Sequence, residues 1–401
     1  MSWEQWVAVI ALVIAVAGLA LGFTVWRALR RRTPSFAHDD PAPEPPRRPT
    51  GPPAVVFNPS KGTDGERLRR LVTEVAAESG LPEPLWLETT VEDPGAGQVR
   101  TALARGASVV IAAGGDGTVR AVAEGLAGTD TPMGVLPLGT GNLLARNLDV
   151  PLTGYRDMVT TALTGRDRAM DLGWLRIERP PAAAEPERDV YRDEPGRTAV
   201  APTPAEEDQA PEVREGSVPG AELDTEHVFL VIGGMGFDAA MVGGADDELK
   251  AKIGWFAYFV GGARHLLGRK IQATLELGDS GESAEFHART VLIANCGRLP
   301  GGVVLFPDAQ LDDGWLDVAA IDTRGGIIGW ADLLRKVVLQ GLGVRRDLLP
   351  YSTGSIEFRR AHTLTIRTAQ PEQVQVDGDL LGEATVVHAR VQHRGLVVRT
   401  P

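Results

Sequence analysis

The chain has 401 residues, 43% of them hydrophobic and 23% charged, so it is long enough for two globular domains with additional segments. Its formal net charge is −12 at pH 7, which argues against a general nucleic-acid-binding protein, because such proteins usually present a dominant basic surface. The single cysteine, Cys296, excludes an intramolecular disulfide and a cysteine-based zinc cluster, and we expect it to be a small buried side chain.

The first segment of the chain, residues 6–26, is apolar and uncharged. A helix needs about 20 such residues to cross the hydrocarbon core of a bilayer. Tryptophans stand at both ends and four arginines follow, a pattern that predicts one transmembrane helix with the rest of the chain on the cytoplasmic side. A cleaved signal peptide is the alternative, but Glu4 takes the place of the basic residues that such a peptide needs. We therefore expect a single-pass protein of the cell membrane, anchored by residues 1–32.

A linker and an α/β domain are expected next. Residues 33–53 are rich in proline and charge, which predicts an extended linker. From Ala54 to residue 172, short apolar runs alternate with stretches of helical periodicity. We expect strands within 54–62, where the run ends in a turn, and at 86–90, 107–118 and 133–139, and helices at 66–79, 98–105 and 119–126. This alternation predicts a mostly parallel sheet covered by helices.

The second half of the chain has a different pattern. Residues 178–226 are dense in Pro, Ala, Glu and Asp, which predicts a disordered insertion. Residues 227–401 contain mainly short β-branched runs, with two helical stretches at 247–267 and 327–342, and predict a second, mainly antiparallel domain. Composition leaves open whether the last strands return to the first domain.

Three glycine-containing turns end successive predicted strands: NPSKG at 58–62, GGDGT at 114–118 and LGTGN at 138–142. NPSKG or LGTGN alone is better explained as a tight turn or a helix cap, whereas GGDGT between a strand and a helix predicts phosphate binding. The carboxyl ends of parallel strands meet at one edge of the sheet, where ligands bind. Glycines let the backbone approach a phosphate, and the N-terminus of a helix favours an anion. Together the turns predict a nucleotide-phosphate site, in which Asp116 holds Mg²⁺ through water or orients main-chain amides or a ribose.

Further motifs follow in a characteristic order: GMGFDAAMV at 234–242, PDAQLDDGWLDV at 307–318 and VDGD at 376–379. With the three turns, they resemble the diacylglycerol kinase catalytic family, which includes bacterial lipid kinases and sphingosine kinases. GGDGT alone would also fit NAD kinases, so the order of the motifs carries the resemblance. It implies an N-terminal α/β nucleotide-binding domain of the NAD kinase type, a C-terminal β-sandwich domain, and ATP in the cleft between them.

The resemblance also implies residue roles. Asp379 stands at the position of the family's catalytic glutamate and would be the base, with Asp377 as the alternative, and Asp116 would serve the nucleotide or magnesium step. Asp313 would hold a structural Mg²⁺, helped by Gln310 and Trp315 through main-chain carbonyls; without the family context, this stretch reads as an acidic hairpin. The residues that would bind ATP are Asn58, Pro59, Ser60, Lys61, Gly62, Thr90, Gly114, Gly115, Asp116, Gly117, Thr118, Val119, Arg120 and Thr140.

The sequence departs from the family pattern in three places. The V-N-E that often opens the helix after GGDGT is Val119-Arg120-Ala121 here. Leu143 replaces the acid of PLGTGND, and Asp379 replaces the glutamate of DGE. Aspartate is one methylene shorter, so the backbone compensates, Asp377 takes the role, or activity is reduced.

The function expected from the resemblance is an ATP- and Mg²⁺-dependent lipid kinase. Diacylglycerol is its default acceptor, and a sphingoid base, ceramide or an isoprenoid alcohol are the alternatives. Residues 250–270 combine aromatic and basic side chains and are either an interfacial or a domain-packing helix. Two rivals are a soluble-substrate kinase of the NAD kinase type and an inactive nucleotide- or lipid-binding membrane protein. The expected partners are a membrane lipid and the membrane itself, with no nucleic acid. The oligomeric state stays open, a homodimer included.

Overall fold

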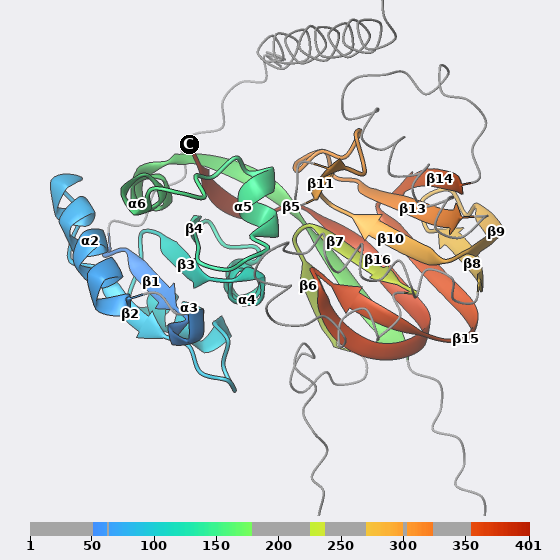
Figure 1. Cartoon of the computed structure of the whole chain (residues 1–401), viewed down its shortest axis with the longest axis horizontal. Helices are drawn as coiled ribbons and strands as arrows, with labels where there is room; N and C mark the ends of the chain where they lie inside the picture. Colours follow the sequence, from blue (N-terminus) through green and yellow to red (C-terminus); the bar gives the residue numbers. More distant parts are fainter. Residues whose placement is uncertain (1–50, 62–63, 179–224, 237–269, 300–302, 324–353) are drawn as a thin grey trace, which may run out of the picture.

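The structure is a computed structural model, and it describes residues 51–61, 64–178, 225–236, 270–299, 303–323 and 354–401 (Figure 1). The expected anchor at 6–26, most of the linker, the interior of the 178–226 segment and the two helical stretches at 247–267 and 327–342 lie outside these residues. Within the described ranges, no helix combines the length and the apolar character that crossing a bilayer requires.

The first unit is the expected α/β layer structure. Its parallel strands are β1 (Ala54–Phe57), β2 (Leu85–Glu88), β3 (Val110–Gly114) and β4 (Met133–Pro137), in the order β2-β1-β3-β4. A short 3-10 turn, η1 (Pro59–Lys61), follows β1. The helices α2 (Gly65–Glu78), α3 (Ala96–Ala104) and α4 (Asp116–Leu126) connect the strands. The alternation read from the sequence is therefore confirmed for this unit.

Side-chain alternation along the strands places helices on both faces of this sheet. Val55 and Phe57 pack with α2 and with α6 (Tyr155–Thr164), whereas Ala54 and Val56 pack with α3 and α4 on the other face. Because both faces are covered, all four residues of β1 are buried. The helices thus cover both faces of the sheet, and the turns that follow the strands lie at the carboxyl edge.

The second unit is rich in antiparallel strands (Figure 1). Its own hydrophobic core joins residues from most of its longer strands. A small hairpin, β11 (Arg298–Leu299) and β12 (Val303–Val304), lies outside the main sheet. The other strands are β5 (Arg166–Glu178), β6 (Glu226–Phe229), β7 (Ile232–Met235), β8 (Ile271–Leu277), β9 (Ser283–Ala288), β10 (Thr290–Ala294), β13 (Leu316–Thr323), β14 (Gly354–Ala361), β15 (Thr363–Val376) and β16 (Asp379–Thr400).

The last strand, β16, joins the two units. It pairs antiparallel with β15 and β5, and its end pairs parallel with β4 through Val398 and Met133. A register shift between Gln392 and Leu396, with Arg394 at φ 51°, separates its two β5-paired stretches. Apart from the β11–β12 hairpin, the described strands therefore form one continuous 14-stranded sheet. The question that composition left open is resolved in favour of a return to the first unit.

The β15–β16 hairpin explains the conformation of VDGD. Val376 pairs with Asp379, so only Asp377 and Gly378 form the loop. Both have positive φ, 48° and 95°, as a two-residue type I′ turn requires, and Asp-Gly is a favoured sequence for it. Asp379 is consequently the first residue of β16.

Candidate nucleotide and catalytic site

The three glycine-containing turns meet at the carboxyl edge of the parallel strands. Asn58 Nδ2 donates to Thr118 Oγ1 at 3.1 Å, which ties the first turn to the second. The second and third turns lie even closer, because a Cβ on Gly139 would stand 2.8 Å from the Cα of Gly115. Lys61 reaches over the same glycine, since a Cβ on Gly115 would be 3.2 Å from Lys61 Cε. The contacts thus bring the three sequence motifs together.

The geometry around Gly115 fits a phosphate group. Gly115 is the N-cap of α4, and its lack of a side chain leaves the first-turn N–H groups without a side-chain cap. A side chain on Gly114 would collide with Thr118 at 2.6 Å. A helix N-terminus without a side-chain acceptor, next to a lysine, is suited to bind an anion. The residues present therefore fit the phosphates of ATP.

Asp116 organises the third turn. Its carboxylate accepts the main-chain N–H groups of Asn142 at 2.9 Å and Leu143 at 2.6 Å. Burial raises the pKa of Asp116 to about 6, while these two hydrogen bonds act in the opposite direction. Of the roles expected for Asp116, the orientation of main-chain amides is the one for which the structure gives contacts.

Asn142 completes the third turn. It lies at φ 50° and accepts from Gly139 N at 3.1 Å through its Oδ1 atom. Thr140 is exposed between the two glycines of this turn. The sequence pattern did not reveal the link between Asp116 and the start of α5 (Leu143–Asn147), because its partners lie more than twenty residues apart in the chain.

Asp377 and Asp379 have different surroundings. The buried Asp377 carboxylate accepts the main-chain N–H groups of Leu230 at 2.7 Å and of Val231 and Ile232 at 2.9 Å each. Burial raises its pKa against the effect of these hydrogen bonds. Both of its oxygens thus accept main-chain hydrogen bonds that hold the β6–β7 connection.

The Asp379 carboxylate lies beside the phosphate-binding turn. A Cβ on Gly117 would be 3.6 Å from Asp379 Oδ2, so the carboxylate stands at the first turn of α4. Its side chain is 34% exposed and forms an ion pair with Arg120. Burial raises the pKa of Asp379, while the positive charges of Arg120 and Lys61 oppose that rise. Of the two carboxylates in this hairpin, Asp379 has the accessibility and location that a base needs.

The remaining expected ATP-binding residues occupy several positions. Ser60 donates through N and Oγ to Asn58 Oδ1, at 2.9 and 2.7 Å, and shapes the first turn together with Pro59. Val119 is buried in the core of the first unit. Thr90 is exposed, and its Oγ1 accepts from Asp93 N at 3.1 Å in the loop after β2. Gly62 lies outside the described residues.

Asp313, the residue expected to hold a magnesium ion, pairs with an arginine in the structure. Asp313 forms an ion pair with Arg360, and its Oδ1 also accepts from Trp315 N at 3.1 Å. The described residues contain no group of three or more His, Cys, Asp or Glu side chains arranged to hold a metal. Gln310 is exposed in the same loop. The Asp313 carboxylate therefore contacts Arg360, and the expected magnesium site, which includes main-chain carbonyls, stays a prediction.

Asp171 fixes this loop, and no sequence motif pointed to it. Its fully buried carboxylate accepts from Gly314 N and Arg394 N, both at 2.6 Å, and contacts His393 Nδ1 at 2.9 Å. Asp171 thereby joins β5, the loop before β13 and the irregularity of β16.

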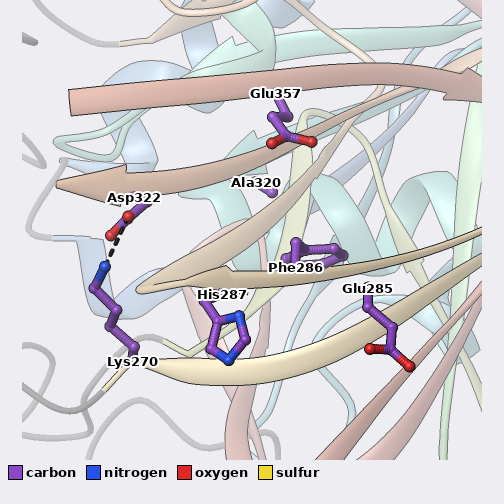
Figure 2. Close-up of a pocket in the computed structure, with 7 residues that line it drawn as sticks. All are labelled: Lys270, Glu285, Phe286, His287, Ala320, Asp322 and Glu357. Atoms are coloured by element: carbon purple, nitrogen blue, oxygen red, sulfur yellow. Dashed lines mark hydrogen bonds and ion pairs between the residues drawn. The ribbon is translucent and has the colours of Figure 1, made fainter. Parts of the chain in front are cut away.

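A separate cavity of about 460 Å³ lies in the β-rich unit (Figure 2). In Figure 2, Lys270 points to Asp322, with an Nζ to Oδ2 distance of 2.8 Å, and Glu285, His287 and Glu357 line the walls. None of its lining residues belongs to the three turns or to the β15–β16 hairpin. Its mostly charged lining does not suit acyl chains.

Two family models match the chain, one in each of its two units. The diacylglycerol kinase catalytic domain matches residues 52–175, and the YegS C-terminal NAD kinase beta sandwich-like domain matches residues 232–398. The chain belongs to the diacylglycerol kinase family. Membership makes it a kinase-type phosphotransferase, and this family uses ATP as its phosphate donor.

Individual relatives of this diacylglycerol kinase family member agree with the family models. An uncharacterized protein of Synechocystis sp. is 25% identical over 70% of this chain, but the match spans only 52% of that relative's length. A Pseudomonas putida protein named "probable lipid kinase YegS-like" is 28% identical over 72% of this chain and 76% of its own length. The crystal structure of a diacylglycerol kinase from Bacillus anthracis superposes with a TM-score of 0.58 at 18% identity, covering 88% of this chain and 97% of the other. The structural likeness supports the fold, an α/β unit followed by a β-rich unit.

Proposed function

We propose that this chain phosphorylates a membrane lipid, with diacylglycerol as the acceptor and phosphatidic acid as the product. The observation that carries the proposal is the position of the Asp379 carboxylate beside Gly117, at the first turn of the helix whose N-terminus forms the phosphate cradle. A base next to the transferable phosphate is the arrangement that phosphoryl transfer to a hydroxyl needs. Family membership and the lipid kinase names of several relatives support the choice of a lipid acceptor.

The residues divide the work of the reaction. The amides of the glycine turns hold the phosphates in place, Lys61 offsets their negative charge, and Asp116 keeps the third turn in position. Mg²⁺ bound with ATP would neutralise further charge on the phosphate oxygens. As the lipid hydroxyl oxygen attacks the γ-phosphorus, the bond to the ADP oxygen breaks and Asp379 accepts the hydroxyl proton. A positioned base of this kind contributes a factor of about 10² to 10⁴ to the rate.

Delivery of the lipid requires a bilayer, and we propose that residues 6–26 anchor the chain in it. The four arginines after this segment favour a cytoplasmic location for the rest of the chain, where ATP is present. A topology reporter fused after Pro401 should therefore be active only in the cytoplasm. Strong activity of a reporter that works only outside the cytoplasm would contradict this orientation.

The decisive experiment for the function is a labelling assay. The purified full chain is incubated with γ-³²P-ATP, Mg²⁺ and vesicles that contain diacylglycerol, a sphingoid base, ceramide or an isoprenoid alcohol, and the labelled lipid is identified. We expect labelled phosphatidic acid, formed about 10² times or more slowly by the Asp379→Asn variant. If the label appears only in another of these lipids, that lipid and not diacylglycerol is the acceptor. In a parallel reaction with NAD in place of the vesicles, labelled NADP would favour a soluble-substrate kinase. ATP binding without transfer to any acceptor would favour an inactive binding protein.

A further inference from the structure

The ion pair between Arg120 and Asp379 joins two of the positions at which this chain departs from its family's pattern. Arg120 stands where the family often has asparagine, in the V-N-E that follows GGDGT, and Asp379 stands where the family has glutamate. We infer that Arg120 is a positioning residue that holds the shorter carboxylate of Asp379 in place for catalysis, so that the two departures compensate each other. This inference rests on the proposed function and deepens it.

Arg120 is well suited to position another side chain. It lies in α4, and its side chain is only 11% exposed. Its neighbours Val119 and Ala121 are buried, so the backbone that carries the arginine is fixed by the core. Asp379 comes from the β-rich unit, at the first residue of β16. The ion pair therefore spans the two units at the point where the phosphate cradle and the proposed base meet.

A physical reason for this ion pair follows from the length of the side chain. Aspartate lacks one methylene of glutamate, so its carboxylate reaches less far from the backbone, and a mispositioned base loses rate steeply. The planar guanidinium of the mostly buried Arg120 holds one oxygen of the carboxylate with little loss of its own freedom. Ion pairs that are partly removed from water are also stronger than exposed ones.

Both positive and negative side chains surround Asp379. Arg120 from α4 and Lys61 from η1 face it with positive charge, whereas Asp116 at the first residue of α4 and Asp377 from its own hairpin add to the negative charge of this cluster. Without Arg120, three carboxylates would share the field of one lysine. An asparagine at position 120 would offer a hydrogen bond but no compensating charge.

A rescue experiment tests the inference. The full chain is prepared as wild type, Arg120→Asn, Asp379→Glu and the double variant, and kcat and KM for ATP are measured with lipid vesicles. We expect Arg120→Asn to lower kcat by about tenfold or more, with KM for ATP changed by less than about threefold. The double variant, which restores the family's residue at both positions, should exceed Arg120→Asn by about tenfold, because the longer carboxylate reaches its position without the arginine.

Three controls distinguish positioning from general damage. Arg156→Gln removes an exposed arginine that pairs with Glu74 and Glu78, and it should leave kcat unchanged. In Arg120→Asn, the acid limb of the kcat–pH profile should move to higher pH, because the loss of a nearby positive charge raises the pKa of Asp379. Arg120→Lys should recover part of the lost kcat. A role in folding alone would lower the active fraction without moving the limb.

Several results would overturn the inference. One is an Arg120→Asn variant with wild-type kcat, another is a double variant as impaired as the single one, and a third is an effect confined to KM for ATP, which would make Arg120 a nucleotide ligand. If the wild type phosphorylates no lipid, the proposed function fails by itself. The ion pair is then tested by thermal unfolding of Arg120→Asn, Asp379→Asn and their combination: coupled shifts of Tm support the pair, and additive shifts overturn it.

Discussion

The carboxylate of Asp377 accepts the main-chain N–H of Leu230 at 2.7 Å, whereas Asp379, two residues further on, makes its ion pair with Arg120. The first contact holds the connection between β6 and β7, and the second lies beside the first turn of α4. Two neighbouring aspartates of one hairpin therefore have separate tasks, one in the architecture of the β-rich unit and one in the proposed chemistry.

Substitution of each aspartate by asparagine should separate these tasks. Asp379→Asn should lower kcat by about 10² or more with little change in ATP affinity, because the amide does not accept the proton. Asp377→Asn should instead lower Tm, since an amide nitrogen placed against a main-chain N–H leaves buried groups unpaired, at a cost of about 1–3 kcal/mol. Lipid labelling and thermal unfolding measure the two effects. A stable but inactive Asp377→Asn beside a fully active Asp379→Asn would reverse the assignment.

The pH dependence of kcat should report the raised pKa of Asp379. The base works only when it is deprotonated, so activity should fall as the pH decreases through this pKa and be complete above it. Because burial raises the pKa, the acid limb should lie above the ordinary aspartate value of about 3.9. The measurement is kcat at saturating ATP and lipid between pH 4.5 and 8, with the stability of the protein checked at each pH. A profile that is flat over this range would contradict the assignment of Asp379 as the base.

Gly139→Ala should weaken ATP binding. The added methyl group would stand 2.8 Å from the Cα of Gly115 and 3.2 Å from Asn142 Oδ1, so the second and third turns must separate. We expect an increase of about tenfold or more in Kd for ATP, measured by calorimetry, because the phosphate cradle depends on this close approach. Thr153→Ala, an exposed position before α6, is the matched control and should leave Kd unchanged. Unaltered affinity in Gly139→Ala would show that the phosphates bind elsewhere.

Deletion of residues 181–220 should leave folding and activity largely intact. β5 and β6 are adjacent antiparallel strands with Arg176 opposite Glu226. The chain therefore leaves the sheet at the end of β5, at Glu178, and enters it again in the neighbouring strand β6. A short connection is therefore sufficient. Tm and kcat of the deletion variant should match those of a variant in which the same segment is replaced by a scrambled sequence of equal length. A folded product from the scrambled variant but not from the deletion would mean that the length of the segment matters, and loss of both would mean that its sequence is needed.

Much of the α/β unit could be predicted because its signals are local. The strands β1 to β4 and the helices α2, α3 and α4 follow from apolar periodicity and from the glycines that end each strand, and the structure places their ends within a few residues of the expected ones. The short α5, the helix α6 and the long β5 were not expected. α5 starts where the main-chain N–H groups of Asn142 and Leu143 donate to the Asp116 carboxylate, so its position depends on a contact between distant residues.

The sequence by itself determined the family, the clustering of three phosphate-binding turns and the two candidate carboxylates, since each depends on residue types at fixed spacing along the chain. Only the tertiary structure decided that β16 returns to β4, that Arg360 pairs with Asp313, and that Asp379 rather than Asp377 lies beside the phosphate-binding turn. The physical reason is the same in each case. The deciding partners are main-chain N–H groups and arginines far away in the sequence, and the burial that they produce sets which carboxylate is occupied and which is accessible.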